Sequence, residues 1–249
     1  MIQGNSLNHL FFFLKKIQKR EPFSFIRPND GEYLIVTNNT FVTQDLWKFN
    51  GGSLQQELLE SIRSCRDIDN CYVGIPCSSC WDQNKTNWCI NNYNINPDKL
   101  TYGNLVCNYN WKIFTNFFID NKIKFFYIGP GETPCTTLNV IDRLYTDPFQ
   151  IEKWDTEKET FKKYVFNWIE NKISNSDKSL FFCFSVGPLT KILIPHLART
   201  YKNHFFFDVG SAFDLFLKGS TNRLYINDNQ LYTKIVCDFQ KGHIKYLDQ

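Results

Sequence analysis

Two carboxylates, Asp30 and Glu32, flank Gly31 directly after an apolar, strand-like segment, and Arg27 stands three residues before Asp30. Mg²⁺ and Mn²⁺ bind carboxylate oxygens and keep coordination positions open for phosphate. Gly31 allows a sharp turn and the close approach of a ligand. The Arg27 guanidinium can bind phosphate through two N–H groups. The pattern predicts a site for a divalent metal or a metal-bound diphosphate, with an ordinary acidic turn as the alternative.

A second candidate is the turn Ser185-Val186-Gly187-Pro188, which follows an apolar strand expected at 180–184 and opens a helix expected at 189–201. The first N–H groups of a helix are free and its dipole is positive there, so an anion can bind. Proline at the first helical position costs no hydrogen bond. Thr190 and Lys191 could add side-chain contacts. The alternative is a plain strand-to-helix connection, and the glycine and lysine spacing is not that of a P-loop.

Asp208 is a third candidate, because it ends an apolar strand expected at 204–207 and is followed by Gly210 and Ser211. In α/β enzymes, residues at strand ends carry much of the chemistry. The alternative is that Asp208 or Ser211 caps the helix that begins near Ala212.

The chain as a whole alternates between strand and helix patterns. Uninterrupted apolar strands indicate a parallel sheet that is covered on both faces, and such sheets bind ligands at the carboxyl ends of their strands. We therefore predict an α/β, Rossmann-like open and mostly parallel sheet with helices on both faces. It would form a single domain over 1–249, with a core at about 20–217 and a C-terminal extension at 218–249. The other expected elements are strands at 23–27, 72–76 and 123–128, helices at 6–20, 109–121, 136–145 and 156–174, a helix opened by a Ser53/Gln56 capping box, an irregular loop at 82–96, and a hairpin of 224–226 with 232–236.

Composition excludes several classes of function. The net charge of +3 and the lack of a Lys/Arg run argue against nucleic-acid binding. No stretch has the apolar length of a transmembrane helix. The segment 6–20 has its basic residues after its apolar run, the reverse of a signal peptide. We interpret it as an amphipathic helix of the core, with attachment to a membrane surface as the alternative.

The nine cysteines predict reduced thiols in a cytoplasmic protein, because the count is odd and no secretory signal is evident. Cys77-Ser78-Ser79-Cys80 has the spacing of half a zinc site, and Cys71 and Cys89 are near it in sequence. A second such pair is missing, so we favour unpaired thiols over a zinc site or a redox pair.

Together the three turns resemble motifs of the GT-D type glycosyltransferases. That family has an Arg-x-Gly-Asp-Gly-Glu turn after its first strand, a Gly-Pro-x-x-Lys helix start and an Asp-Ile-Gly turn. The corresponding segments here are Arg27–Glu32, Gly187–Lys191 and Asp208–Gly210, and Val73-Gly74-Ile75-Pro76 matches the second strand. Their order and spacing agree over roughly residues 20–217.

The resemblance implies transfer of a sugar from a nucleotide diphosphate donor, with UDP as the expected nucleotide, to a glycan or glycoprotein acceptor. Asp30 and Glu32 would hold Mn²⁺ or Mg²⁺ and the diphosphate. Asp208 or Asp214 would complete the metal site or act as the base. A homodimer is compatible with this family.

Two departures from the family pattern matter. Asn29 replaces a glycine, and Asn tolerates the left-handed backbone that the turn would need. Ser211 replaces a histidine that is frequent in bacterial members, so no role of that histidine transfers. Two other functions stay open, namely an inactive nucleotide-sugar or carbohydrate-binding module and another Rossmann-like transferase such as a methyltransferase.

Overall fold

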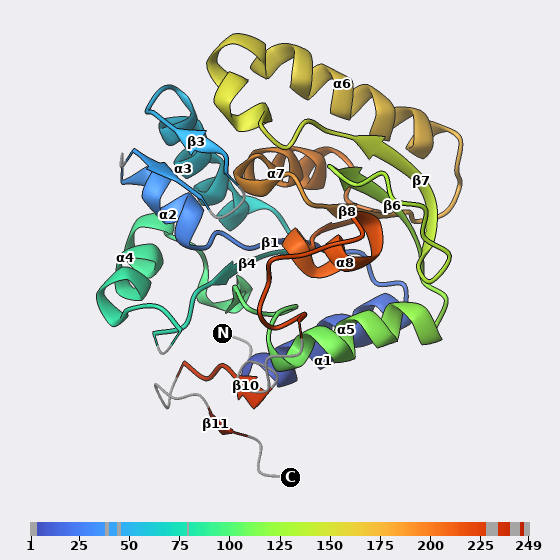
Figure 1. Cartoon of the computed structure of the whole chain (residues 1–249), viewed down its shortest axis with the longest axis horizontal. Helices are drawn as coiled ribbons and strands as arrows, with labels where there is room; N and C mark the ends of the chain where they lie inside the picture. Colours follow the sequence, from blue (N-terminus) through green and yellow to red (C-terminus); the bar gives the residue numbers. More distant parts are fainter. Residues whose placement is uncertain are drawn as a thin grey trace.

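A seven-stranded sheet in which all pairings are parallel forms the centre of the molecule (Figure 1). The computed structural model describes residues 4–37, 40–43, 46–78, 80–227 and 234–239 and the backbone of 245–246. The α/β fold predicted from the sequence is confirmed. In spatial order the strands are β5 (Leu100–Tyr102), β4 (Cys71–Ile75), β1 (Ser24–Ile26), β9 (Phe205–Asp208), β8 (Phe181–Phe184), β6 (Lys124–Gly129) and β7 (Asn139–Tyr145).

The aromatic strands β8 and β9 supply both halves of the core. Along β9, Phe206 packs on one face of the sheet, whereas Phe205 and Phe207 pack on the other. In the same way Phe182 and Cys183 of β8 belong to opposite faces. Alternation of apolar residues on both faces is what a sheet covered by two helical layers requires.

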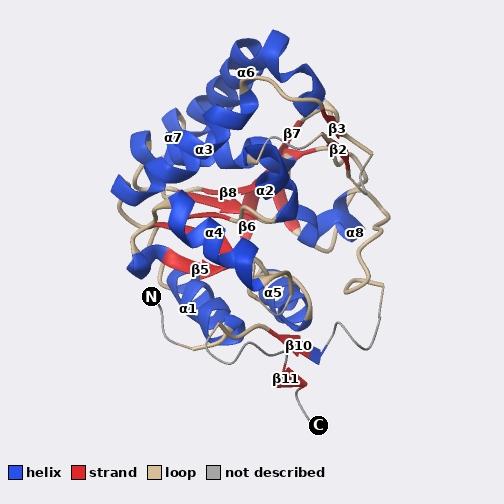
Figure 2. Ribbon diagram, turned by 90° about the vertical axis from the view of Figure 1, so that its left-hand side faces the viewer, coloured by secondary structure: helices blue, strands red, loops and turns tan. Residues whose placement is uncertain are grey.

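Two layers of helices cover the sheet (Figure 2). Helices α3, α6 and α7 lie on one side of the strands, and α1 and α5 lie on the other. Helix α1 is therefore part of the core, as predicted. No described helix combines the length and the apolar character that a membrane span requires. The helices are α1 (Ser6–Gln18), α2 (Asp30–Val36), α3 (Leu54–Ser64), α4 (Gln83–Tyr93), α5 (Tyr109–Asp120), α6 (Trp154–Ser174), α7 (Thr190–Thr200) and α8 (Asp214–Leu217).

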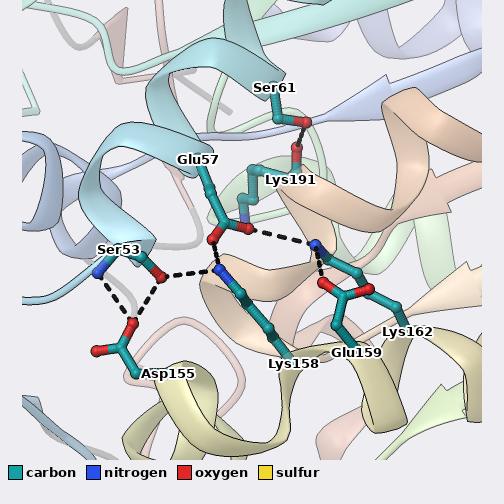
Figure 3. A network of polar contacts seen from close by, with 8 residues as sticks. All are labelled: Ser53, Glu57, Ser61, Asp155, Lys158, Glu159, Lys162 and Lys191. Carbon is teal, nitrogen blue, oxygen red and sulfur yellow. Dashed lines mark hydrogen bonds and ion pairs between the residues drawn. The ribbon is translucent and has the colours of Figure 1, made fainter.

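Polar contacts join α3 to α6 and α7 (Figure 3). Glu57 of α3 accepts ion pairs from Lys158 and Lys162 of α6. The Ser61 hydroxyl of α3 donates to the carbonyl oxygen of Lys191 in α7 at 2.8 Å. The predicted Ser53 capping box is wrong, because the Ser53 hydroxyl donates to Asp155 at 2.6 Å and makes no cap bond.

Two other local predictions are wrong. The segment expected to be an irregular loop at 82–96 contains α4, whose first turn is capped by the Asp82 carboxylate and whose Cys89 and Tyr93 are buried. The segment 136–145 was expected to be helical but contains β7, which extends the sheet beside β6. Val140 and Leu144 are four residues apart and therefore fit a helix face as well as an edge strand.

Two small antiparallel sheets complete the described structure. One consists of β2 (Phe41–Val42) with β3 (Lys48–Phe49), and the other of β10 (Ile235–Val236) with β11 (Lys245–Tyr246). Of the predicted C-terminal hairpin, residues 224–226 form a turn rather than a strand, and 235–236 pair with 245–246 instead. The part of that prediction at 232–233 lies outside the described residues.

Candidate functional site

A cleft of about 780 Å³ lies at the carboxyl edge of the sheet. Arg27, Gly187 and Asp208, which follow or end the neighbouring strands β1, β8 and β9, all line it. Its volume is in the range of small-molecule sites. The structure brings together nearly all the site residues predicted from the sequence: Arg27, Asp30, Gly31, Glu32, Gly187, Pro188, Lys191, Asp208, Gly210, Ser211 and Asp214.

Thr190 is the exception, and its predicted ligand contact is corrected. The residue is fully buried, and its hydroxyl accepts a hydrogen bond from the backbone N–H of Val186 at 3.2 Å. It therefore stabilises the turn that opens α7 and does not face the cleft.

The buried ammonium of Lys191 holds three segments of this edge together. Its Nζ lies 2.8 Å from Glu32 Oε1, 2.8 Å from Asp208 Oδ2 and 3.2 Å from the Gly187 carbonyl oxygen. Three N–H groups thus meet three acceptors, which is the full capacity of an ammonium. Burial lowers the pKa of Lys191, but Asp208 and Glu32 raise it by more, so the group stays charged.

The carboxylate of Asp208 is likewise held by contacts within the protein, and the residue is only 1% exposed. Its Oδ2 also accepts the Arg27 backbone N–H at 3.1 Å, and its Oδ1 accepts the Gly210 N–H at 3.1 Å. The structure therefore gives Asp208 the role of connecting β1, β9 and Lys191. A base must reach a substrate hydroxyl, and these contacts occupy the carboxylate that was predicted to do so.

Asp30 and Glu32 point to different surroundings because they open helix α2 rather than forming a free turn. Residues two apart on a helix do not face each other. Glu32 is buried against Lys191, and its Oε2 accepts the Asn29 N–H at 2.8 Å. Asp30 is exposed at the cleft. Asn29 has φ −111°, so the left-handed backbone expected there is not used.

The ion pair predicts an acid-sensitive contribution to stability. Burial raises the pKa of Glu32, but Lys191 and the Asn29 N–H lower it by more, to a net value below the ordinary one. A depressed folded pKa stabilises the protein above the unfolded value, about 4.3, and this stabilisation is lost as the pH falls through the folded pKa. We expect the free energy of unfolding, measured by urea titration from about pH 5 to pH 3, to fall more steeply in the wild type than in Glu32→Gln. Equal slopes would contradict this.

Arg27 lines the cleft, and its guanidinium has a partner that the sequence analysis did not identify. Its Nη1 donates to Cys107 Sγ at 2.9 Å. The Ser211 hydroxyl lies 2.9 Å from the Tyr225 hydroxyl, and both residues line the cleft. Cys107 and Tyr225 do not belong to any recognisable sequence motif. The packing of the loop after β5 and of the C-terminal segment brings them to the site.

Two glycines with positive φ line the cleft. Gly210 has φ +48°, and a Cβ there would lie 3.1 Å from the Arg27 guanidinium carbon. Gly187 has φ +53°, and a Cβ there would meet nothing within 4 Å. Both positions need glycine for their backbone conformation, and the Gly187 turn also faces open space.

Asp214 completes the set of cleft carboxylates. It is buried at the start of α8, and its Oδ2 accepts an ion pair from Lys218 at 3.0 Å.

Comparison with known proteins identifies the fold. No family model and no curated protein matches the sequence. Three solved structures match, each with 14% sequence identity. One, described as domain of unknown function 1792, covers 85% of this chain and 81% of its own length with a TM-score of 0.54. In a second, the highly conserved domain of unknown function 1792 is described as having a distinct glycosyltransferase fold. The match covers 96% of this chain and 90% of that one with a TM-score of 0.55.

This chain has that glycosyltransferase fold. The third structure, described as a new glycosyltransferase of the same domain type from Streptococcus sanguinis, covers 85% of this chain and 84% of its own length with a TM-score of 0.53. The likeness extends over most of the chain.

Proposed function

We propose that this protein is a metal-dependent glycosyltransferase that transfers a sugar from a nucleotide diphosphate sugar, with UDP as the expected nucleotide, to a glycan or glycoprotein acceptor. One observation carries the proposal. Groups suited to a diphosphate, at the ends of β1 and β8, converge in one cleft of a fold described as a glycosyltransferase fold.

The phosphates of the donor would lie between Arg27 and the Gly187 turn. A guanidinium binds phosphate oxygens through parallel N–H groups. The Gly187 turn faces open space, so phosphate oxygens can approach its backbone without meeting a side chain. The nucleotide diphosphate gains negative charge as the sugar leaves, and fixed donors at that position stabilise this charge.

Asp30 fits the role of the protein ligand to Mg²⁺ or Mn²⁺. Such a metal is commonly held by one or two carboxylates together with substrate phosphates and water. Asp30 offers an exposed carboxylate at the cleft, whereas Glu32 is committed to Lys191. When bound, the metal would neutralise charge on the leaving diphosphate. Glu32 would then act indirectly, because its contacts with Lys191 and Asn29 fix the start of the helix that carries Asp30.

Asp214 is the second predicted aspartate at the cleft and stays a candidate for the base. It lines the cleft, and its Oδ2 contacts Lys218, which directly follows its short helix. In an inverting reaction such a carboxylate would accept the proton of the acceptor hydroxyl.

Replacing Asp30 with asparagine tests the proposal. We expect UDP binding in the presence of Mn²⁺, measured by calorimetry, to weaken by about 10–100-fold, because one charge-assisted contact is lost. Hydrolysis of UDP-sugars should fall with it. Asp147→Asn is the matched control, since Asp147 lines the same cleft but is held by Lys153 at 2.7 Å.

Unchanged binding and hydrolysis in Asp30→Asn would overturn the assignment of Asp30. If the wild type binds UDP with Mn²⁺ but neither hydrolyses nor transfers any nucleotide sugar, the binding-module alternative is correct instead.

A further inference from the structure

Three cysteines from distant parts of the sequence meet beside the cleft. The sulfur atoms of Cys77, Cys80 and Cys237 all lie within 4.8 Å of one another, and those of Cys80 and Cys237 are 3.3 Å apart. Cys77 and Cys80 follow β4, and Cys237 follows β10. In the described part of the chain, these three residues form the group of at least three His, Cys, Asp or Glu side chains whose ligand atoms are close enough together to hold one metal ion.

The surroundings keep the three sulfur atoms in place. The Cys80 N–H donates to the Cys77 carbonyl oxygen at 3.2 Å, which closes the turn between them. Cys237 is fixed by Ser6, whose hydroxyl accepts its N–H at 3.0 Å and whose N–H donates to its carbonyl oxygen at 2.8 Å. The Asn104 amide donates to Cys237 Sγ at 3.6 Å. An amide hydrogen bond to a sulfur ligand is the kind of outer contact that orients metal sites.

We propose that Cys77, Cys80 and Cys237 bind one Zn²⁺ ion through three thiolates. Thiolates are soft ligands that select thiophilic cations such as zinc, whereas the carboxylates of the cleft suit Mg²⁺ or Mn²⁺. Each thiol would give up its proton to solvent when the metal binds. Three protein ligands leave the fourth tetrahedral position for water or another small ligand.

The position of the cluster gives the zinc ion a structural task. Cys77 and Cys237 are buried together with Tyr102 and Ile235, while Cys80 is exposed and lines the cleft. Phe239 stacks on Tyr102 with the ring centroids 3.9 Å apart. A metal bound here would fasten the segment 234–239 to the ends of β4 and β5, beside the mouth of the cleft. Cys80 provides the entry path from solvent.

The sequence pattern pointed to only half of this site. Cys71 and Cys89 are close to the Cys77–Cys80 pair in sequence, but neither belongs to the cluster. Cys71 starts β4 and therefore lies at the opposite end of that strand from Cys77. The third ligand comes from a position 157 residues beyond Cys80.

Cobalt substitution tests the site without reference to enzymatic activity. Protein that has been reduced and freed of metal by a chelator is titrated with Co²⁺ alone. We expect a thiolate-to-cobalt charge-transfer band and intense tetrahedral ligand-field bands that saturate at one ion per chain and disappear when one equivalent of Zn²⁺ is added. Cys80→Ser and Cys237→Ser should lose these bands. Cys135→Ser, which removes a partly exposed thiol outside the cluster, should keep them.

Cys80 is exposed, so its replacement does not threaten folding, and circular dichroism verifies this. Absence of the bands in the wild type would overturn the proposal, as would their persistence in Cys237→Ser. Recovery of a Cys80–Cys237 disulfide from protein kept under reducing conditions would also overturn it. The zinc site does not depend on the glycosyltransferase function, and either can fail without the other.

Discussion

Replacing Lys191 with methionine should lower the free energy of unfolding by about 3–5 kcal/mol, because removing one partner of a buried ion pair leaves uncompensated charge. In Lys191→Met, the carboxylates of Glu32 and Asp208 would lose their shared ammonium while only 5% and 1% exposed, respectively. Urea unfolding at neutral pH measures the loss. A change below about 1 kcal/mol would place this interaction among ordinary surface pairs.

Two controls separate the buried charges from a general effect of losing a lysine. Lys162→Met removes a more accessible ammonium between α6 and α3 and should cost far less. Adding Glu32→Gln to Lys191→Met should restore part of the lost stability, because one of the two stranded charges disappears. Strict additivity of the two single changes would contradict a shared network.

Replacing Arg27 with methionine should lower kcat for sugar transfer by about 10²–10³-fold, the usual effect of removing one donor that stabilises transition-state charge. Folding should survive, because Asp208 is bonded to the backbone N–H of Arg27 and not to its side chain. The measurement is nucleotide release from the donor sugar at saturating acceptor, with the unfolding midpoint followed in parallel.

Arg27→Lys is the matched variant. It retains the charge but loses the planar pair of N–H groups, so we expect activity between that of Arg27→Met and the wild type. Wild-type kcat in Arg27→Met, with its fold intact, would remove Arg27 from the proposed mechanism.

Strands that consist almost entirely of apolar residues were predictable from the sequence. The aromatic runs that became β8 and β9 have no polar interruption, so their burial on both faces follows from the residues alone. Helix α4 was missed because its sequence is rich in asparagine, which has a low helix propensity. Tertiary contacts of Cys89 and Tyr93 compensate for that propensity, and no local pattern reports them.

The positions of the site residues were likewise easier to predict than their partners. Strand ends of a parallel sheet share an edge, so the convergence of Arg27, Gly187 and Asp208 could be expected. Which carboxylate meets which cation depends on helix phase and packing. Glu32 faces inward and Asp30 outward because α2 begins at Asp30, and that start was expected to be a turn.

The cleft depends on the place of β9 between β1 and β8 in the sheet. Ser24 of β1 pairs with Phe206 of β9, although they are the first and last strands of that sheet in chain order. Contacts so distant in sequence require a long loop to close, which costs conformational entropy and slows folding. Until β9 inserts, β1 and β8 have unpaired edges, which invite aggregation. The same strand brings Asp208 to Lys191 and Arg27, so the closed sheet and the site depend on the same insertion.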